Sequence, residues 1–229
     1  MPLDAVLLEF DGVLAETAEA RRDALLRALA EEGFSPSPSE AAALDPYAVP
    51  SDVARSIARE RGTAADETAV ELVTLRARRH FGERAARGLA LAPGAAPLVR
   101  QLAARARLAV VSASARGAVE LILQLSDLEG LVTVTSSAED GATPPAPDLL
   151  AHAIARLDRA RPVRAAGVLA VCGTSAGLLA ATRAGVRAVA VGAMPAHEAI
   201  RAAAYVPSLD GMSADALLHL AGIAPEPVP

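Results

Sequence analysis

The chain has 229 residues, of which 52% are hydrophobic and 21% are charged, and its formal net charge at pH 7 is −5. This composition can bury a large core and excludes a disordered chain, a collagen-like fibre and a small disulfide-rich scaffold. All 22 basic residues are arginine, and they alternate with acids along helix-like segments instead of forming the basic stripe of a nucleic-acid binding protein. We therefore expect no nucleic-acid partner.

No apolar run reaches the roughly 18 residues that a membrane-spanning helix needs. The N-terminal sequence has an early acid and lacks the basic region of a secretory signal peptide. The single cysteine, Cys172, cannot form an internal disulfide, as expected in a reducing compartment. These features favour a cytoplasmic protein with no membrane partner.

The predicted elements begin with a short buried strand over residues 5–10, which ends at an Asp-Gly pair. The stretch from 15 to 92 then has no convincing strand, and its amphipathic helical patterns lie at 16–32, 51–61 and 66–82. Four further apolar runs are separated mostly by helical patterns of about ten residues. These runs lie at 108–111, 131–134, 167–171 and 186–191.

Alternation of strand and helix at this spacing predicts βαβ units and a parallel sheet that is buried on both faces. We predict an α/β core domain over residues 1–14 and 93–223, with an all-helical insertion over residues 15–92. The Pro-rich tail, 224–229, is expected to be disordered.

Ligands of an open parallel sheet bind beyond the carboxyl ends of its strands. The loops that begin at Glu9, Ser112, Thr135 and Cys172 are therefore the places where we expect chemistry. Glu9 and Asp11 are two residues apart, so an extended chain would point both carboxylates the same way. Paired carboxylates suit a nucleophile with a general acid/base, or a metal site.

Four segments carry the residues that suggest a reaction, and they lie at 6–17, 108–116, 144–148 and 172–177. In this order and spacing they resemble the motifs of the haloacid dehalogenase superfamily, in the branch of the phosphoglycolate phosphatases and β-phosphoglucomutases. The resemblance covers nearly the whole chain. It implies an α/β core with a Rossmann-like parallel sheet, a helical cap inserted after the first strand, and Mg²⁺-dependent chemistry on small phosphorylated metabolites.

The resemblance also implies a role for each motif position. Family members use an Asp nucleophile, a second Asp as general acid/base, and a Ser or Thr together with a Lys that hold the phosphate. In this chain the nucleophile position is Glu9, the acid/base is Asp11, the hydroxyl is Ser112 and the lysine position is Pro144. Two of these four positions therefore depart from the family pattern.

The family's Mg²⁺-binding Asp falls on Gly173, or on Thr174 if the last motif is shifted by one residue, and neither register supplies a carboxylate. Glu in place of Asp moves the carboxylate oxygens by about 1.5 Å, and a misplacement on the order of 1 Å can cost ~10²-fold in rate. A phosphate about 4 Å from this carboxylate would be repelled by roughly 4 kcal/mol at an effective dielectric of about 20. Arg116, in the first turn of the next helix, can offset only part of this repulsion.

The candidate catalytic residues lie at strand ends and at a helix start: Glu9, Asp11, Ser112 and Arg116. The first two are also the only remnant of a Mg²⁺ site, which we expect to be unoccupied. The candidate substrate-binding residues belong to the core loops and to the cap helix: Gly12, Ala113, Arg76 and Arg78. Two residues have alternative interpretations. Cys172 could be a reactive thiol or a small buried residue. His80 could contact substrate or belong to a solvated basic face.

The sequence thus predicts a haloacid dehalogenase-like hydrolase that is catalytically impaired or inactive and serves to bind an unknown protein or ligand. Two alternatives stay open. The first is an active Mg²⁺-dependent phosphatase or phosphomutase of small phosphorylated metabolites, with an altered metal site. The second is a metal-independent hydrolase that uses Glu9, Asp11 or Cys172.

Overall fold

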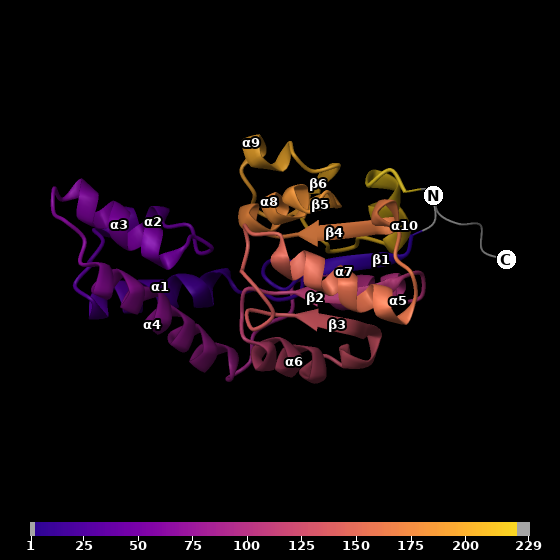
Figure 1. Cartoon of the computed structure of the whole chain (residues 1–229), viewed down its shortest axis with the longest axis horizontal. Helices are drawn as coiled ribbons and strands as arrows, with labels where there is room; N and C mark the ends of the chain where they lie inside the picture. Colours follow the sequence, from indigo (N-terminus) through magenta and orange to yellow (C-terminus); the bar gives the residue numbers. More distant parts are fainter. Residues whose placement is uncertain (1–2, 224–229) are drawn as a thin grey trace. The chain divides into compact units, whose positions relative to one another are not determined.

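The computed structural model describes residues 3–223 (Figure 1). The tail that the sequence predicts to be disordered, 224–229, lies outside the described residues. Within 3–223, no helix combines the length and the apolar character that crossing a bilayer requires.

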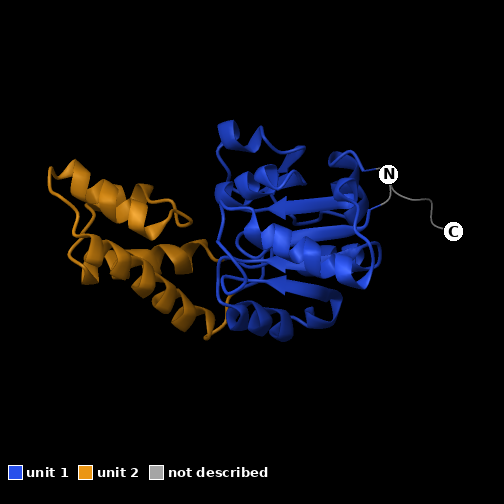
Figure 2. Cartoon of the chain, viewed as in Figure 1, with its two compact units in different colours: residues 1–16, 90–229 blue, residues 17–89 orange. Residues whose placement is uncertain are grey.

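The chain divides into two compact units, coloured separately in Figure 2. Residues 1–16 and 90–229 form the first, which we call the α/β unit, and residues 17–89 form the second, which we call the helical unit. The second unit is thus an insertion between the first strand of the α/β unit and the rest of that unit.

The α/β unit is built on a parallel sheet with the strand order β3-β2-β1-β4-β5-β6. The strands are β1 (Ala5–Glu9), β2 (Arg107–Val111), β3 (Val132–Ser136), β4 (Val168–Cys172), β5 (Arg187–Val191) and β6 (Ala204–Val206). The predicted α/β class with a parallel sheet is confirmed. The last strand was not predicted, because its three residues form no apolar run.

Helices cover both faces of this sheet, and alternation along the strands decides which side chains meet them. Ala5, Leu7 and Ala170 belong to the core cluster beneath α7 (Asp148–Ala160) and α8 (Ser175–Arg183). The alternate residues, such as Leu8 and Val110, are equally buried and face the side of α5, which packs on β2. Both faces of the sheet are therefore buried, as expected for strands whose residues are almost all apolar.

The remaining helical elements of the α/β unit connect the strands or close the sheet. They are α5 (Ala95–Ala103), α6 (Arg116–Leu125), η1 (Glu129–Leu131), η2 (Ala165–Gly167), α9 (Ala196–Ala199) and α10 (Ala214–Leu220). The chain runs outward from β1 through β2 to β3 and then crosses back to β4 on the other side of β1. The carboxyl end of β1 is thus the switch point where ligands bind in such sheets.

The helical unit consists of α1 (Ala18–Glu31), α2 (Pro38–Ala43), α3 (Pro50–Glu60) and α4 (Glu67–Ala85). α1 and α4 lie side by side, and α3 packs on α4 (Figure 1). Their shared core includes Leu25, Leu29, Ile57 and Val73. Local caps fix the helix starts: Ser37 and Glu40 form a capping box at α2, and the Asp66 side chain caps α4.

Candidate functional site

The Glu9 side chain, at the end of β1, turns toward the start of α8. One of its oxygens, Oε2, accepts hydrogen bonds from the backbone N–H groups of Gly173 (2.8 Å) and Thr174 (3.0 Å). The other, Oε1, lies 2.6 Å from Oγ1 of Thr174. Only 9% of Glu9 is exposed. The residue at the family's nucleophile position is therefore held by the loop between β4 and α8.

This loop is shaped to receive a carboxyl group. The N-cap of α8 is Thr174, whose hydroxyl accepts a hydrogen bond from the backbone N–H of Gly177 (2.9 Å). Gly177 lacks a side chain, and a Cβ at this position would overlap the carboxyl atoms of Glu9. Helix N-termini attract anions through their free N–H groups and their dipole. In this chain the N-terminus of α8 receives the chain's own Glu9.

The environment of Glu9 favours its protonated form. Burial raises the pKa of Glu9 from the ordinary 4.5 to about 8, and the neighbouring Asp11 contributes to the rise. The hydrogen bonds from Thr174 and Gly173 oppose the rise without cancelling it. Glu9 therefore carries its proton over most of the neutral range.

The backbones of the first and last motifs touch, and this contact restricts which residue fits at position 173. A Cβ at Gly173 would lie 2.5 Å from the carbonyl oxygen of Asp11 and 2.6 Å from the carbonyl carbon of Gly12. With this backbone, position 173 therefore has room for glycine alone. A carboxylate in the shifted register would replace the Thr174 side chain, which faces Glu9.

Asp11 and Gly12 form the tight turn that follows β1. Asp11 is 4% exposed, and Gly12 has a positive φ of 71° and donates its N–H to the carbonyl of Ala15 (3.0 Å). At the end of β2, Ser112 is also buried, and its Oγ accepts a hydrogen bond from the N–H of Ser114 (3.0 Å). The Ser112 hydroxyl thus shapes its own loop, beside the half-buried Ala113.

Arg116, the first residue of α6, is engaged by the chain itself. Its guanidinium donates to the carbonyl of Thr135 (2.9 Å) and forms an ion pair with Asp140. Its backbone N–H, at the helix start, donates to the carboxylate of Glu139 (3.1 and 3.2 Å). The cation that was expected to screen a bound phosphate is therefore neutralised by a neighbouring acid.

Pro144, at the family's lysine position, lines a small, mainly apolar cavity together with Glu9, Val111, Cys172 and Gly177. Position 144 and Glu9 therefore line the same cavity. Burial raises the pKa of the Cys172 thiol well above its ordinary value, and the adjacent Glu9 raises it further. A protonated, buried thiol is unreactive, which favours the interpretation of Cys172 as a core residue.

The residues predicted on the helical unit have different environments. Arg76 forms ion pairs with Glu31 (2.7 Å) and with Glu32, whereas Arg78 is exposed. His80 is only 9% exposed and lies 2.8 Å from Glu31 through its Nε2. The segment is therefore not a uniformly solvated basic face, because its histidine packs inside the unit.

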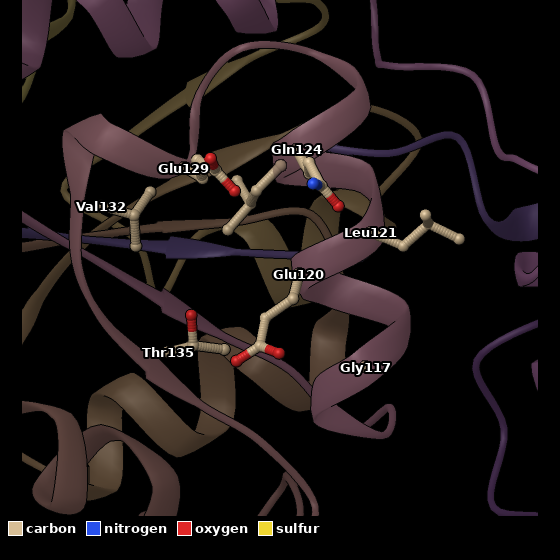
Figure 3. A pocket seen from close by; sticks show the side chains of 8 residues that line it. Gly117, Glu120, Leu121, Gln124, Glu129, Val132 and Thr135 are labelled. Atoms are coloured by element: carbon tan, nitrogen blue, oxygen red, sulfur yellow. The ribbon is translucent and has the colours of Figure 1, made fainter.

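A further cavity of about 560 Å³ lies between α6 and β3 (Figure 3). None of the candidate catalytic, metal-binding or substrate-binding residues line it, although Thr135, the start of one of the loops where chemistry was expected, does. Glu120 and Glu129 contribute carboxylates to its lining, and Gln124 and Thr135 contribute polar groups. Across residues 3–223, no cluster of three or more His, Cys, Asp or Glu side chains could hold a metal ion.

Comparisons with known proteins agree on the fold. Residues 6–191 match the family model described as haloacid dehalogenase-like hydrolase. Similar solved structures include CbbY from Rhodobacter sphaeroides in complex with phosphate, with 24% sequence identity and a TM-score of 0.71 over 94% of this chain and 96% of that chain. A β-phosphoglucomutase from Clostridium difficile has 15% identity and a TM-score of 0.74 over 96% and 97% of the two chains.

A hydrolase from Pseudomonas syringae is also similar, with 18% identity and a TM-score of 0.75 over 97% of this chain and 100% of that chain. At these identities the likeness shows the shared fold alone. No curated protein sequence matches the chain.

Proposed function

Because the chain belongs to the haloacid dehalogenase-like hydrolase family, we propose that it is a member that does not hydrolyse phosphate esters and whose fold serves binding. The observation that carries this proposal is the position of Glu9. Its carboxyl group accepts hydrogen bonds from the start of α8 and does not stand free at the end of β1.

A carboxylate nucleophile needs an ionised oxygen with a lone pair directed at phosphorus. Both oxygens of Glu9 are already engaged in hydrogen bonds with Gly173 and Thr174. The raised pKa of about 8 keeps the carboxyl largely neutral near pH 7, and a neutral carboxylic acid is a poor nucleophile. Geometry and ionisation thus both oppose attack by Glu9.

The donor set around Glu9 also does not fit Mg²⁺. This ion takes oxygen ligands in octahedral geometry, usually including one or two carboxylates. The groups of Gly173 and Thr174 that face Glu9 are two N–H donors and one hydroxyl, and N–H groups present positive charge to any cation. The donors of Gly173 and Thr174 therefore do not form a Mg²⁺ site together with Glu9.

The groups that would attract a phosphate already bind acidic side chains of the same chain. The start of α8 holds Glu9, and the start of α6 holds Glu139. The guanidinium of Arg116 is paired with Asp140. Pro144 supplies neither a charge nor an N–H donor. A phosphate dianion would have to displace these internal partners without a divalent ion to help it.

The direct test is an assay of Mg²⁺-dependent hydrolysis of p-nitrophenyl phosphate and phosphoglycolate by the wild-type chain and by Glu9→Gln. We expect both proteins to stay at the background rate. Turnover by the wild type that Glu9→Gln abolishes would overturn the proposal in favour of an active phosphatase with an altered site. Glu9-dependent turnover of haloacids in EDTA would instead favour the metal-independent hydrolase.

A variant that restores the family's residues tests whether these positions explain the expected lack of turnover. The triple change Glu9→Asp, Pro144→Lys and Thr174→Asp supplies the family's nucleophile, cation and metal ligand, and Asp suits the N-cap of α8 that Thr174 now forms. We expect this variant to gain Mg²⁺-dependent turnover. The matched control, Glu9→Asn with the same two other changes, should stay at background because an amide cannot be phosphorylated as the carboxylate is.

A further inference from the structure

We propose a second binding site in the helical unit, specific for a small phosphate monoester that carries a free hydroxyl group. It lies in the groove between α1 and α4 and is independent of the loops around Glu9. The proposal rests on a buried histidine with an unpaired nitrogen, on the arginines that share its cavity, and on the space between them.

His80 has a polar atom that the protein leaves unsatisfied. Its side chain is 8% exposed, and its Nε2 lies 2.8 Å from Oε1 of Glu31. Its Nδ1 is buried and makes no hydrogen bond in the described structure. The nearest acid to that atom, Glu83, is 3.7 Å away, which is too far for a hydrogen bond. A buried polar atom without a partner costs about 1–3 kcal/mol, so this one calls for an explanation.

The unsatisfied nitrogen lies on the side of a cavity. A space of about 70 Å³ is lined by residues of α1 and by residues at and just beyond the end of α4, and it exceeds the roughly 15 Å³ that a single water needs. Glu83 lines this space together with His80, whereas Glu31, the partner of Nε2, does not. The ring nitrogen nearer to Glu83 is Nδ1. Nδ1 therefore lies on the cavity side of the ring, and Nε2 faces the Glu31 carboxylate.

The charge of the lining indicates the first half of the ligand. Arg27, Arg84 and Arg87 all line the cavity. Within residues 3–223, the guanidinium groups of Arg27 and Arg87 form no ion pair or hydrogen bond, and that of Arg84 donates only to the carbonyl of Gly88 (2.6 Å). Guanidinium groups bind phosphate through paired, charge-assisted hydrogen bonds. Three of them at one cavity outnumber the two acids of the lining, Asp23 and Glu83.

The unsatisfied nitrogen of His80 indicates the second half. Nδ1 is buried without a hydrogen-bond partner in the described structure. A hydroxyl group both donates and accepts, so it satisfies this nitrogen whichever ring nitrogen carries the proton. The acids of the lining can accept from further hydroxyl groups. A phosphate beside an alcohol satisfies the arginines and Nδ1 together.

The test is a titration with glycerol 3-phosphate, followed through the ring nitrogens of the four histidines and the backbone amides in ¹H–¹⁵N NMR spectra. We expect saturable shifts of the His80 Nδ1 resonance, no comparable response to glycerol, and unchanged amides of Gly173 and Gly177. Shifts confined to those two amides would overturn the site and would also argue against the proposed function, because they would place the phosphate at α8. Absence of any saturable shift would overturn the site alone.

Substitutions of exposed arginines test the site without disturbing the buried core. Arg87→Gln and Arg27→Gln each remove one charge-assisted hydrogen bond and should weaken binding by about tenfold. Arg59→Gln makes the same change of charge in α3, away from the cavity, and should bind as the wild type does. If the two cavity variants bind as tightly as Arg59→Gln, the arginines do not form the site and the proposal fails.

Discussion

The buried carboxyl of Glu9 should make the stability of the fold depend on pH in a defined direction. Burial raises its pKa from the ordinary 4.5 to about 8, so between these values the folded chain keeps a proton that the unfolded chain releases. The stability that Glu9 contributes is therefore complete below about pH 4.5 and is lost as the pH rises through about 8. At about 1.36 kcal/mol per pKa unit, a change from pH 5 to pH 8 should lower the free energy of unfolding by about 3 kcal/mol.

The variant Glu9→Gln isolates this contribution from all other titrating groups. A neutral amide resembles the protonated acid, since its oxygen can accept the N–H groups of Gly173 and Thr174 while its NH₂ group donates to the Thr174 hydroxyl. The measurement is urea unfolding of both proteins at several values between pH 5 and pH 8. Stability of the wild type relative to the variant should fall by about 3 kcal/mol across this range. A difference that stays constant to within about 0.5 kcal/mol would refute the reasoning.

Three further predictions concern the contacts around the same loop. Gly177→Ala should destabilise the wild type by about 1–3 kcal/mol, because the added methyl group overlaps the Glu9 carboxyl. In the Glu9→Ala background the same substitution should cost much less, and equal costs in both backgrounds would exclude the contact. Gly173→Ala should lower the free energy of unfolding by about 2 kcal/mol or more, measured by thermal or urea unfolding, because the added Cβ would meet the backbone of Asp11 and Gly12. Thr174→Ser keeps the hydroxyl and should lower it by less than about 1 kcal/mol. Cys172, buried with a raised thiol pKa, should react with a thiol reagent only at the rate of unfolding, and fast labelling of the native chain would contradict its burial.

Much of the fold could be predicted from periodicity alone. The apolar runs gave five of the six strands, and the helical patterns at 16–32, 51–61 and 66–82 correspond to α1, α3 and α4. The family resemblance, drawn from four short segments, is confirmed by the match over residues 6–191. Short elements escaped prediction because β6 and α2 are too brief to show a period.

The site was harder to predict, since its decisive contacts join residues far apart in the chain. The steric restriction at Gly173 depends on a backbone approach to Asp11, about which the local sequence carries no information. The pairing of Arg116 with Asp140 and of His80 with Glu31 likewise depends on tertiary packing. The residue types at these positions indicated where the chain departs from the family pattern, and the structure shows which groups those residues contact.

The contact between Glu9 and the start of α8 also bears on how such a chain could change over generations. Glu9→Asp alone would withdraw the carboxyl from two backbone N–H groups, while Thr174→Asp alone would remove a hydroxyl partner and set a second carboxyl against the first. Each single step loses stability without assembling a metal site, because the positions are energetically coupled. Positions 9 and 174 are therefore expected to change together, because either substitution alone leaves the other residue without its hydrogen-bond partner.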